Sequence, residues 1–314
     1  MGDPPPGSAA PLALAPRADL KVGFACNNKC VFCAQGTKRS ECGSIPLGEL
    51  LRRLEQVKDH THGLVLTGGE PTLYKPLVDL VRAARAMGFT QVQIQTNGRM
   101  LAYPRVLAAL VGAGATEFSP SLHGSRPEIH DRLTRARGSW RETLGGIRNL
   151  CRMGATVITN SVITCSNVHD LPRLVALLGR VGVVEAQLAF VHPVGTALEM
   201  FDEVVPRLPD VVEPLRQARA VAGRLGMRLV AEAMPYCFMR GLEDMVVEDA
   251  IPDTTVVDLN GQIENYSRWR VVEGKSHGPP CEGCAMQRRC EGPWREYPER
   301  YGWDEFVPLP AAGR

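Results

Sequence analysis

Short apolar strands alternate with amphipathic helices over residues 18–194, and this alternation restricts the fold more than any other feature of the chain. Strands are predicted at 20–25, 63–67, 91–96, 115–121, 155–164 and 185–191. Between them, apolar residues recur at helical spacing, as in Leu77, Leu80, Val81 and Ala84. Six β/α units in series predict an α/β fold with parallel strands and right-handed crossovers. In a barrel of this kind, ligands bind at the carboxyl ends of the strands.

Two local patterns refine this prediction. Ser139 with Glu142 has the spacing of a capping box, which would open a helix that turns Trp140 and Leu144 inward. A later helix is predicted over 211–225, and the composition changes after it.

Cys26, Cys30 and Cys33 form a CxxxCxxC at the end of the first predicted strand. Each iron of a [4Fe–4S] cube needs its own ligand, usually a Cys thiolate. Cys42 is nine residues further on, so three thiolates would leave one iron open for another ligand. A tetrahedral zinc site is the alternative, although zinc usually takes paired CxxC knuckles or adds His at short spacing.

The loop resembles the CxxxCxΦC motif of the radical S-adenosylmethionine (radical SAM) enzymes, with Phe32 at the aromatic position. In that family the open iron binds the amino and carboxylate groups of SAM, which is then cleaved to methionine and a 5′-deoxyadenosyl radical. Gly68-Gly69-Glu70-Pro71 follows a predicted strand and looks like the family's GGE motif, which binds the SAM amino group. Glycine lets the backbone approach a ligand closely, and Glu70 can accept charge-assisted hydrogen bonds from an ammonium.

The same resemblance implies a partial (β/α)6 TIM-like barrel and further SAM contacts at its strand ends. Ser121 and Asn160 are ribose or carboxylate ligands by this resemblance, and Arg135 or Arg137 would reach the SAM carboxylate. The alternatives for each are an N-cap, a turn residue or a solvated charge. A lone histidine at a strand end, such as His123, is more often a structural hydrogen-bonding residue than a catalyst.

The C-terminal quarter carries a second group of cysteines. After Cys237 comes a predicted hairpin, Thr254–Asp258 and Gln262–Tyr266 about Asn260-Gly261, and then Cys281, Cys284 and Cys290. The spacing C-x2-C-x5-C is typical of metal ligands, and a zinc knuckle is one interpretation.

Beside a radical SAM domain, this segment instead resembles the SPASM and twitch domains, which carry auxiliary [4Fe–4S] clusters. Tyr266 and Trp294 stand where a full SPASM domain has cysteines of its first auxiliary cluster. The resemblance therefore implies a reduced domain, a small β-hairpin and helix unit whose single auxiliary [4Fe–4S] cluster is held by four cysteines. These are Cys237, Cys281, Cys284 and Cys290.

Composition limits the setting of this chemistry. Ten cysteines in a chain without a secretory signal favour metal or redox chemistry in a reducing compartment, and hence a cytoplasmic location. A net charge of +2, without a basic run that interleaves aromatics, argues against a nucleic-acid partner. No apolar run reaches membrane-spanning length. The expected organisation is a disordered leader over 1–17, a radical SAM partial barrel over 18–230, and the auxiliary domain over 231–314.

These patterns together indicate an enzyme that reductively cleaves SAM and abstracts hydrogen from a peptide or a small molecule. An auxiliary cluster without an open iron favours net oxidation or crosslinking, and an electron donor such as flavodoxin or ferredoxin would supply the cleavage step. A zinc-stabilised binding module and an iron–sulfur electron carrier without SAM chemistry are the alternatives. The sequence indicates neither the substrate nor the catalytic acid or base.

Overall fold

One mostly parallel sheet forms the centre of the molecule. The computed structural model describes residues 16–259 and 261–310. Across these residues the strand order is β7-β6-β5-β4-β3-β2-β1-β8-β9, and every neighbouring pair is parallel except β8 with β9. The strands are β1 Arg17–Lys21, β2 Gly63–Thr67, β3 Gln91–Thr96, β4 Glu117–Pro120, β5 Thr156–Ile163, β6 Glu185–Phe190, β7 Arg228–Glu232, β8 Thr254–Asp258 and β9 Gly261–Ile263.

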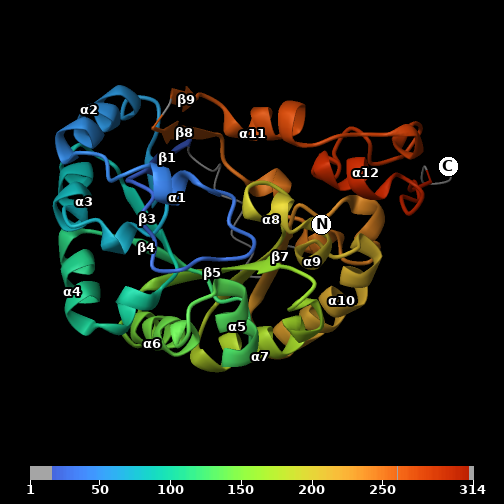
Figure 1. The fold of residues 1–314 in the computed structure, drawn as a ribbon, viewed down its shortest axis with the longest axis horizontal. Coiled ribbons are helices and arrows are strands. Elements are labelled where there is room, and N and C mark those ends of the chain that lie inside the picture. The colour runs from blue at the N-terminus through green and yellow to red at the C-terminus, as the bar shows by residue number, and fades with distance from the viewer. Residues whose placement is uncertain (1–15, 260, 311–314) are drawn as a thin grey trace, which may run out of the picture.

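Helices cover the outside of this sheet, as Figure 1 shows for α2, α3, α4, α6, α7 and α10. The helices are α1 Lys38–Glu41, α2 Leu47–Val57, α3 Leu77–Ala86, α4 Pro104–Ala113, α5 Pro127–Thr134, α6 Ser139–Arg152, α7 Leu171–Val181, α8 Thr196–Glu199, α9 Phe201–Val204, α10 Leu208–Arg224, α11 Tyr266–Trp269 and α12 Glu296–Tyr301. Short 3-10 turns and one π-helical turn, Arg270–Gly274, complete the chain. The expected α/β partial barrel is confirmed.

The strand predictions hold for β2, β3 and β8 to the residue and differ elsewhere. The first strand ends at Lys21 rather than at residue 25, because Gly23 has φ +148° and bridges to Ser44 instead of extending the strand. It begins at Arg17, the last residue of the expected leader, of which residues 1–15 lie outside the described residues. The turn residue Asn260 also lies outside them.

Two features of the sheet were not predicted. Strand β7, Arg228–Glu232, extends the sheet beyond β6, and the helical pattern before it gave no signal for it. The hairpin strand β8 pairs in parallel with β1, from Arg17 opposite Thr254 to Leu20 opposite Val257. The hairpin therefore belongs to the same sheet as the barrel strands and leads directly from them into the C-terminal segment.

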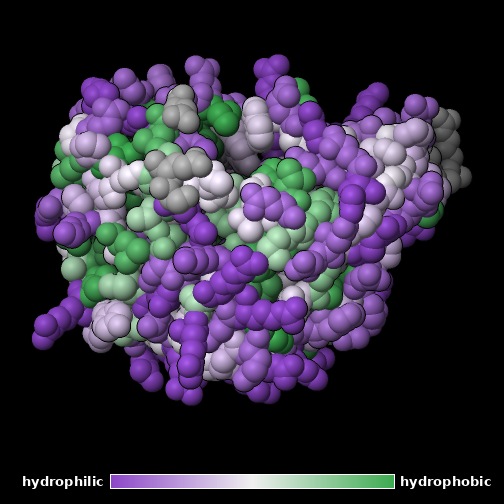
Figure 2. All heavy atoms as spheres, viewed as in Figure 1, coloured by the Kyte–Doolittle hydropathy of each residue, from purple (hydrophilic) through white to green (hydrophobic). Residues whose placement is uncertain are grey.

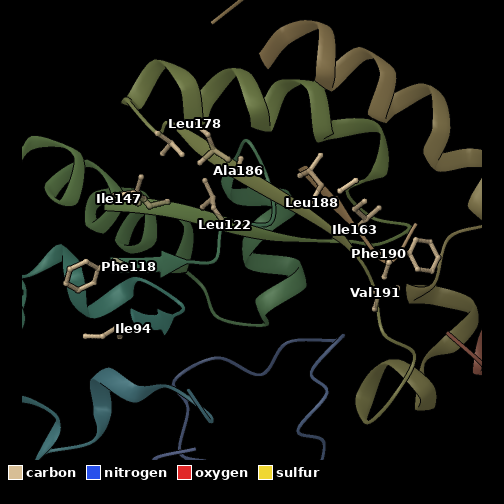
Figure 3. Close-up of a cluster of buried hydrophobic side chains, with 14 of the residues drawn as sticks. Ile94, Phe118, Leu122, Ile147, Ile163, Leu178, Ala186, Leu188, Phe190 and Val191 are labelled. Carbon is tan, nitrogen blue, oxygen red and sulfur yellow. The ribbon is translucent and has the colours of Figure 1, made fainter. Parts of the chain in front are cut away.

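The two faces of the sheet differ in polarity. On the outer face, buried apolar residues such as Leu20, Leu66 and Ile94 pack against the helices. Figure 3 shows part of this core, where Leu188 and Phe190 of β6 lie near Ile163 of β5. The inner face carries half-buried, largely polar residues. On the surface, Figure 2 shows hydrophilic residues around the rim and apolar patches nearer the middle of the same view. Among the described residues, no helix is both long and apolar enough to cross a bilayer.

The predicted capping box at α6 is wrong. Gly138, with φ +86°, occupies the N-cap position, so Ser139 falls inside the helix. The carboxylate of Asp131 caps the helix instead, because it accepts hydrogen bonds from the backbone N–H groups of Gly138 (2.7 Å) and Trp140 (2.8 Å). Glu142 bonds to Arg99 rather than to the backbone. A capping residue this far back along the chain is outside the reach of a local motif.

We expect Asp131→Ala to lower the free energy of unfolding by about 2 kcal/mol, because two backbone donors at the start of α6 lose their acceptor. Glu128→Ala, on the exposed face of the neighbouring helix, is the matched control and should have little effect. Urea denaturation followed by circular dichroism measures both. Equal stability of the two variants would contradict the capping role.

Candidate active site

The loop that carries Cys26, Cys30 and Cys33 lies at the carboxyl end of β1 and is held from several sides. The backbone N–H groups of Lys29 and Val31 donate to the carbonyls of Thr134 (2.8 Å) and Leu133 (2.9 Å) at the end of α5. The carbonyl of Cys33 accepts from Thr196 N at 3.1 Å. All three cysteines are half-buried on this one loop.

The surroundings of these thiols suit metal-bound thiolates. Burial raises the pKa of Cys30 to about 12 and also raises that of Cys26, so both are protonated thiols at neutral pH unless a metal displaces the proton. Asn28 N lies 3.4 Å from Cys26 Sγ, and Asn97 Nδ2 lies 3.9 Å from it. N–H donors directed at sulfur stabilise a thiolate and tune a cluster bound to it.

Gly68 and Gly69 lock the end of β2 against this loop. The N–H of Gly69 donates to Gly23 O, and the N–H of Glu70 donates to Ala25 O, both at 2.8 Å. A Cβ on Gly69 would lie 2.3 Å from the carbonyl oxygen of Phe24, and one on Gly68 would lie 2.1 Å from Gly23 O. The two glycines are thus needed for close contact between two loops of the protein itself. The sequence motif predicted only close approach to a ligand.

The Glu70 carboxylate is buried and organises the next strand end. Oε1 accepts from Thr72 N (3.0 Å), Thr72 Oγ1 (2.5 Å) and Thr96 Oγ1 (2.6 Å). Oε2 accepts from Asn97 N at 2.6 Å. Burial raises the pKa of Glu70, while its hydrogen bonds with Thr72, Thr96 and Asn97 oppose that shift. Oε2 retains one acceptor position for a further donor.

The residues predicted at the ends of β4 and β5 lie side by side. Ser121 and Asn160 form a parallel bridge, and Ser121 N donates to Thr96 O at 3.0 Å. The side-chain oxygen of Asn160 is buried and has no partner among the described residues. A buried orphan acceptor at this edge of the sheet fits a ligand that donates a hydrogen bond.

His123 has the structural role expected of it. Its ring is buried and lies edge-on to Phe32 at 4.7 Å. Nδ1 accepts the backbone N–H of Val162 at 3.2 Å, which requires an unprotonated nitrogen. Burial holds the pKa of His123 well below its usual value, so the ring stays neutral. The aromatic position of the cysteine motif is therefore fixed by packing on a neutral histidine.

Arg99 is a site residue that the sequence did not indicate. It reaches from the end of β3 to the cysteine loop, where Nη1 donates to Asn27 O (2.5 Å) and Asn28 Oδ1 (3.0 Å), and it pairs with Glu142 at 2.5 Å. Arg135, a suggested ligand of the SAM carboxylate, is exposed and has Nη2 3.0 Å from Met200 Sδ. Only the folded loop brings Arg99 to the cysteines, since more than sixty residues separate them in the chain.

The second cysteine group also lines one cavity. Cys237, Cys281, Cys284 and Cys290 border it together with apolar residues that include Phe306 and Pro308. Burial raises the pKa of Cys237 to about 12, and the other three thiols add to this shift. Backbone N–H groups lie 3.4 Å from two of the sulfurs, Gly292 N from Cys290 Sγ and Leu309 N from Cys284 Sγ.

In chemistry, these four residues fit the ligand set of an iron–sulfur cluster. All are thiols on two separate segments around an apolar space, and N–H donors approach their sulfurs. Across residues 16–259 and 261–310, no three His, Cys, Asp or Glu side chains converge as the ligands of a single metal ion do. Of the three remaining cysteines, Cys165 is exposed, and Cys42 and Cys151 are half-buried.

Aromatic packing fills the positions where a full SPASM domain has further cysteines. Trp294 is 5% exposed, and its ring stacks on His192 with centroids 3.6 Å apart. Tyr266 begins α11 and stacks on Trp269 at 5.4 Å.

The inner face of the sheet is a polar surface. Lys21 Nζ donates to Asp19 Oδ1 (3.0 Å) and Thr67 Oγ1 (2.8 Å), and Gln93 Nε2 donates to Glu117 Oε2 (3.2 Å). Further along the sheet, Glu232 accepts from Gln187 and Arg270. A molecule bound against the inner face of the sheet would therefore contact ion pairs and amides rather than apolar side chains.

A loop with three thiols at the carboxyl end of β1, held by a Gly-Gly-Glu turn after β2, is suited to an iron–sulfur cluster and its ligand. The Radical SAM superfamily model matches residues 20–178, just over half of the chain. The chain belongs to the radical SAM superfamily. It is an enzyme of the radical SAM type, and the family implies a [4Fe–4S] cluster and SAM.

Curated relatives and solved structures agree with this assignment. The chain is 32% identical over 181 residues to a probable GTP 3′,8-cyclase of Methanopyrus kandleri, covering 56% of each chain. It is 30% identical over 202 residues to the probable GTP 3′,8-cyclase of Metallosphaera sedula, covering 59% of each. The chain thus spans less than two thirds of the length of these relatives.

Two solved structures share the fold at low sequence identity. Streptococcus suis SuiB bound to S-adenosylmethionine has a TM-score of 0.67 and 15% identity, over 90% of this chain and 73% of that chain. Native anSMEcpe with bound AdoMet has a TM-score of 0.67 and 14% identity, over 94% of both chains.

We expect Gly69→Ala to lower the free energy of unfolding by about 1–3 kcal/mol, because the new methyl group forces the β2 end away from the cysteine loop. The same variant should lose iron from the site at Cys26, Cys30 and Cys33. Gly112→Ala is the control, because no atom lies within 4 Å of its added Cβ on helix α4. Iron analysis and urea denaturation of both variants check this, and full iron content in Gly69→Ala would contradict it.

Proposed function

We propose that this enzyme cleaves SAM reductively, abstracts a hydrogen atom from its substrate and completes a net oxidation or crosslink with an auxiliary [4Fe–4S] cluster. The observation that carries the proposal is the presence of two separate thiol groups, three around the β1 loop and four around the C-terminal cavity. Three thiolates leave one iron open for SAM, whereas four close a cube.

The chain's own residues would bind and orient SAM at the first site. When bound, the cluster supplies the electron that cleaves SAM to methionine and a 5′-deoxyadenosyl radical. The free acceptor position of Glu70 would take the SAM ammonium, with the backbone of Gly68 and Gly69 alongside. Ser121 and the unpartnered oxygen of Asn160 would bind the ribose or the carboxylate.

The second site would receive the electron that the substrate loses. Oxidation of a substrate radical releases one electron and, from a neighbouring N–H or O–H, one proton. A cluster bound by Cys237, Cys281, Cys284 and Cys290 has no free iron, so electron transfer is its simplest role.

The substrate we propose is a polar small molecule or a peptide with polar side chains, in keeping with the charged inner face. Relatives are named for GTP, and the SuiB structures include one bound to the precursor peptide SuiA. A flavodoxin or ferredoxin would reduce the first cluster. We propose no nucleic-acid or membrane partner.

Reconstituted protein should contain about eight irons per chain, two cubes of four. Joint replacement of Cys281, Cys284 and Cys290 by Ala should remove half of this iron and leave SAM cleavage in place, with loss of the oxidised product. Iron near four in the wild type, or zinc at the C-terminal site, would reject the auxiliary cluster.

Replacement of Cys30 by Ala should abolish 5′-deoxyadenosine formation under dithionite, because the three thiolates leave no spare ligand. Cys165→Ala, at an exposed thiol outside both groups, is the matched control and should retain the activity. Chromatographic assay of 5′-deoxyadenosine measures both. Undiminished cleavage in Cys30→Ala would exclude the assigned SAM cluster.

Glu70→Gln should weaken SAM binding about tenfold, a difference of ~1.4 kcal/mol, because the amide loses the charge that attracts the ammonium. Its oxygen can still accept at the position of Oε1, but its NH2 group then faces Asn97 N at the position of Oε2, so iron content is measured in the same variant. Glu70→Ala is less informative, since it leaves the buried donors of Thr72, Thr96 and Asn97 unpaired. Anaerobic titration calorimetry, with Glu55→Gln as an exposed control, gives the two affinities. Unchanged affinity at normal iron content would rule out this role.

A further inference from the structure

A series of charged side chains connects the inner face of the sheet with the C-terminal cysteines. Glu232, at the end of β7, accepts from Arg270 Nη1 at 3.1 Å, and Arg270 Nη2 donates to Glu291 at 2.5 Å. The other oxygen of Glu291 lies 4.0 Å from Lys275 Nζ. Glu291 directly follows Cys290, so these ion pairs reach from the substrate face to a proposed cluster ligand.

Lys275 is the least compensated member of this series. Its side chain is 1% exposed, and Nζ has no hydrogen-bond partner among the described residues. Nζ lies 4.3 Å from the centroid of the Trp294 ring, a cation–π contact. A buried ammonium without hydrogen bonds is costly, because water solvates the charge strongly.

The balance at longer range comes from carboxylates. Burial lowers the pKa of Lys275, while Glu248, Glu291 and Glu232 oppose this shift and Arg270 adds to it. Three carboxylates face two cations in this cluster. These carboxylates partly offset the effect of burial on the Lys275 ammonium.

The backbone holds this charge beside the auxiliary site. Lys275 pairs with Trp294 in an antiparallel bridge, and Ser276 N donates to Pro293 O at 3.1 Å. His277 Nε2 lies 2.9 Å from Cys290 O, so residues 275–277 run alongside 290–294. Burial raises the pKa of the Cys290 thiol, and the charge of Lys275 opposes that shift.

Trp294 links this charge to the barrel. One contact of its ring is with Lys275, and the ring also stacks on His192, with the planes 10° apart. His192 follows the end of β6, at the carboxyl edge of the sheet. Lys275 is therefore connected on one side, through Trp294 and His192, to the carboxyl edge of the sheet, and on the other side, through Glu291, to the chain at Cys290.

We propose that Lys275 is a fixed positive charge that raises the reduction potential of the auxiliary cluster and so favours electron uptake from the substrate. The inference rests on the proposed function, because it requires that cluster. The substrate radical loses one electron to the cluster and one proton to water, and a C=N or C=O bond forms. A nearby cation stabilises the reduced, more negative cluster relative to the oxidised one.

The test is a redox titration followed by electron paramagnetic resonance. The full chain with Cys26, Cys30 and Cys33 replaced by Ala leaves only the auxiliary cluster to observe. In this background, Lys275→Met and Lys275→Gln should lower the midpoint potential by about 59 mV, which is a tenfold change for a one-electron couple. A charge about 10 Å away at an effective dielectric constant of about 20 has an effect of this size.

Two control variants separate charge from packing. Lys275→Arg keeps the charge, so its midpoint potential should differ from that of the parent by only a small fraction of that shift. The same holds for Lys75→Met, at an exposed lysine before α3. Loss of iron in the neutral variants with retention in Lys275→Arg would still support a requirement for charge.

The outcomes that overturn the inference differ from those that overturn the proposed function. Equal midpoint potentials in Lys275→Met, Lys275→Gln and the parent would overturn the inference on Lys275 and leave the proposed auxiliary cluster unaffected. Loss of iron in Lys275→Arg as well would assign a packing role to the side chain and overturn it too. A parent background without about four irons would instead reject the proposed auxiliary cluster.

Discussion

The pair of backbone hydrogen bonds from Gly69 N to Gly23 O and from Glu70 N to Ala25 O is the contact on which the candidate site depends. It joins the end of β2 to the cysteine loop after β1, and only glycine allows the close approach. Glu70 then extends the connection to the end of β3 through Thr96 and Asn97. Three strand ends are thus fixed relative to one another before any cofactor binds, and the thiols are held on a preorganised loop.

The same sheet also positions the second group of thiols. Because β8 pairs with β1 and β7 pairs with β6, the segments that follow both strands return to the molecule beside the barrel. Cys237 follows β7, and the other three C-terminal cysteines follow the β8–β9 hairpin. The charged series from Glu232 to Lys275 lies where these two segments meet the inner face. The cysteine loop of the barrel and the C-terminal cysteines therefore belong to one packed unit, although the chain separates them.

Much of the fold could be predicted from the sequence because parallel strands and amphipathic helices follow local periodicity. The prediction failed where a distant residue decided the outcome. Asp131 caps α6 in place of Ser139, and Gly23 ends β1 early through its bridge to Ser44. Strand β7 lacks a local signal and exists because β6 offers an unpaired edge. Arg99 was also missed for this reason, because its contact with the cysteine loop joins residues that are far apart in the chain.

The sequence by itself determined the chemistry of this protein, because ligand type and short-range spacing are encoded locally. Three cysteines on one loop, with Gly68-Gly69-Glu70 after the next strand, specify radical SAM family membership. Only the tertiary structure decided the environment of that chemistry. It buried Lys275 beside the C-terminal cysteines, stacked Trp294 on His192 and lined the inner face with ion pairs. These contacts join segments far apart in the chain. Their energies depend on burial and on distance in space, and neither can be read from spacing along the sequence.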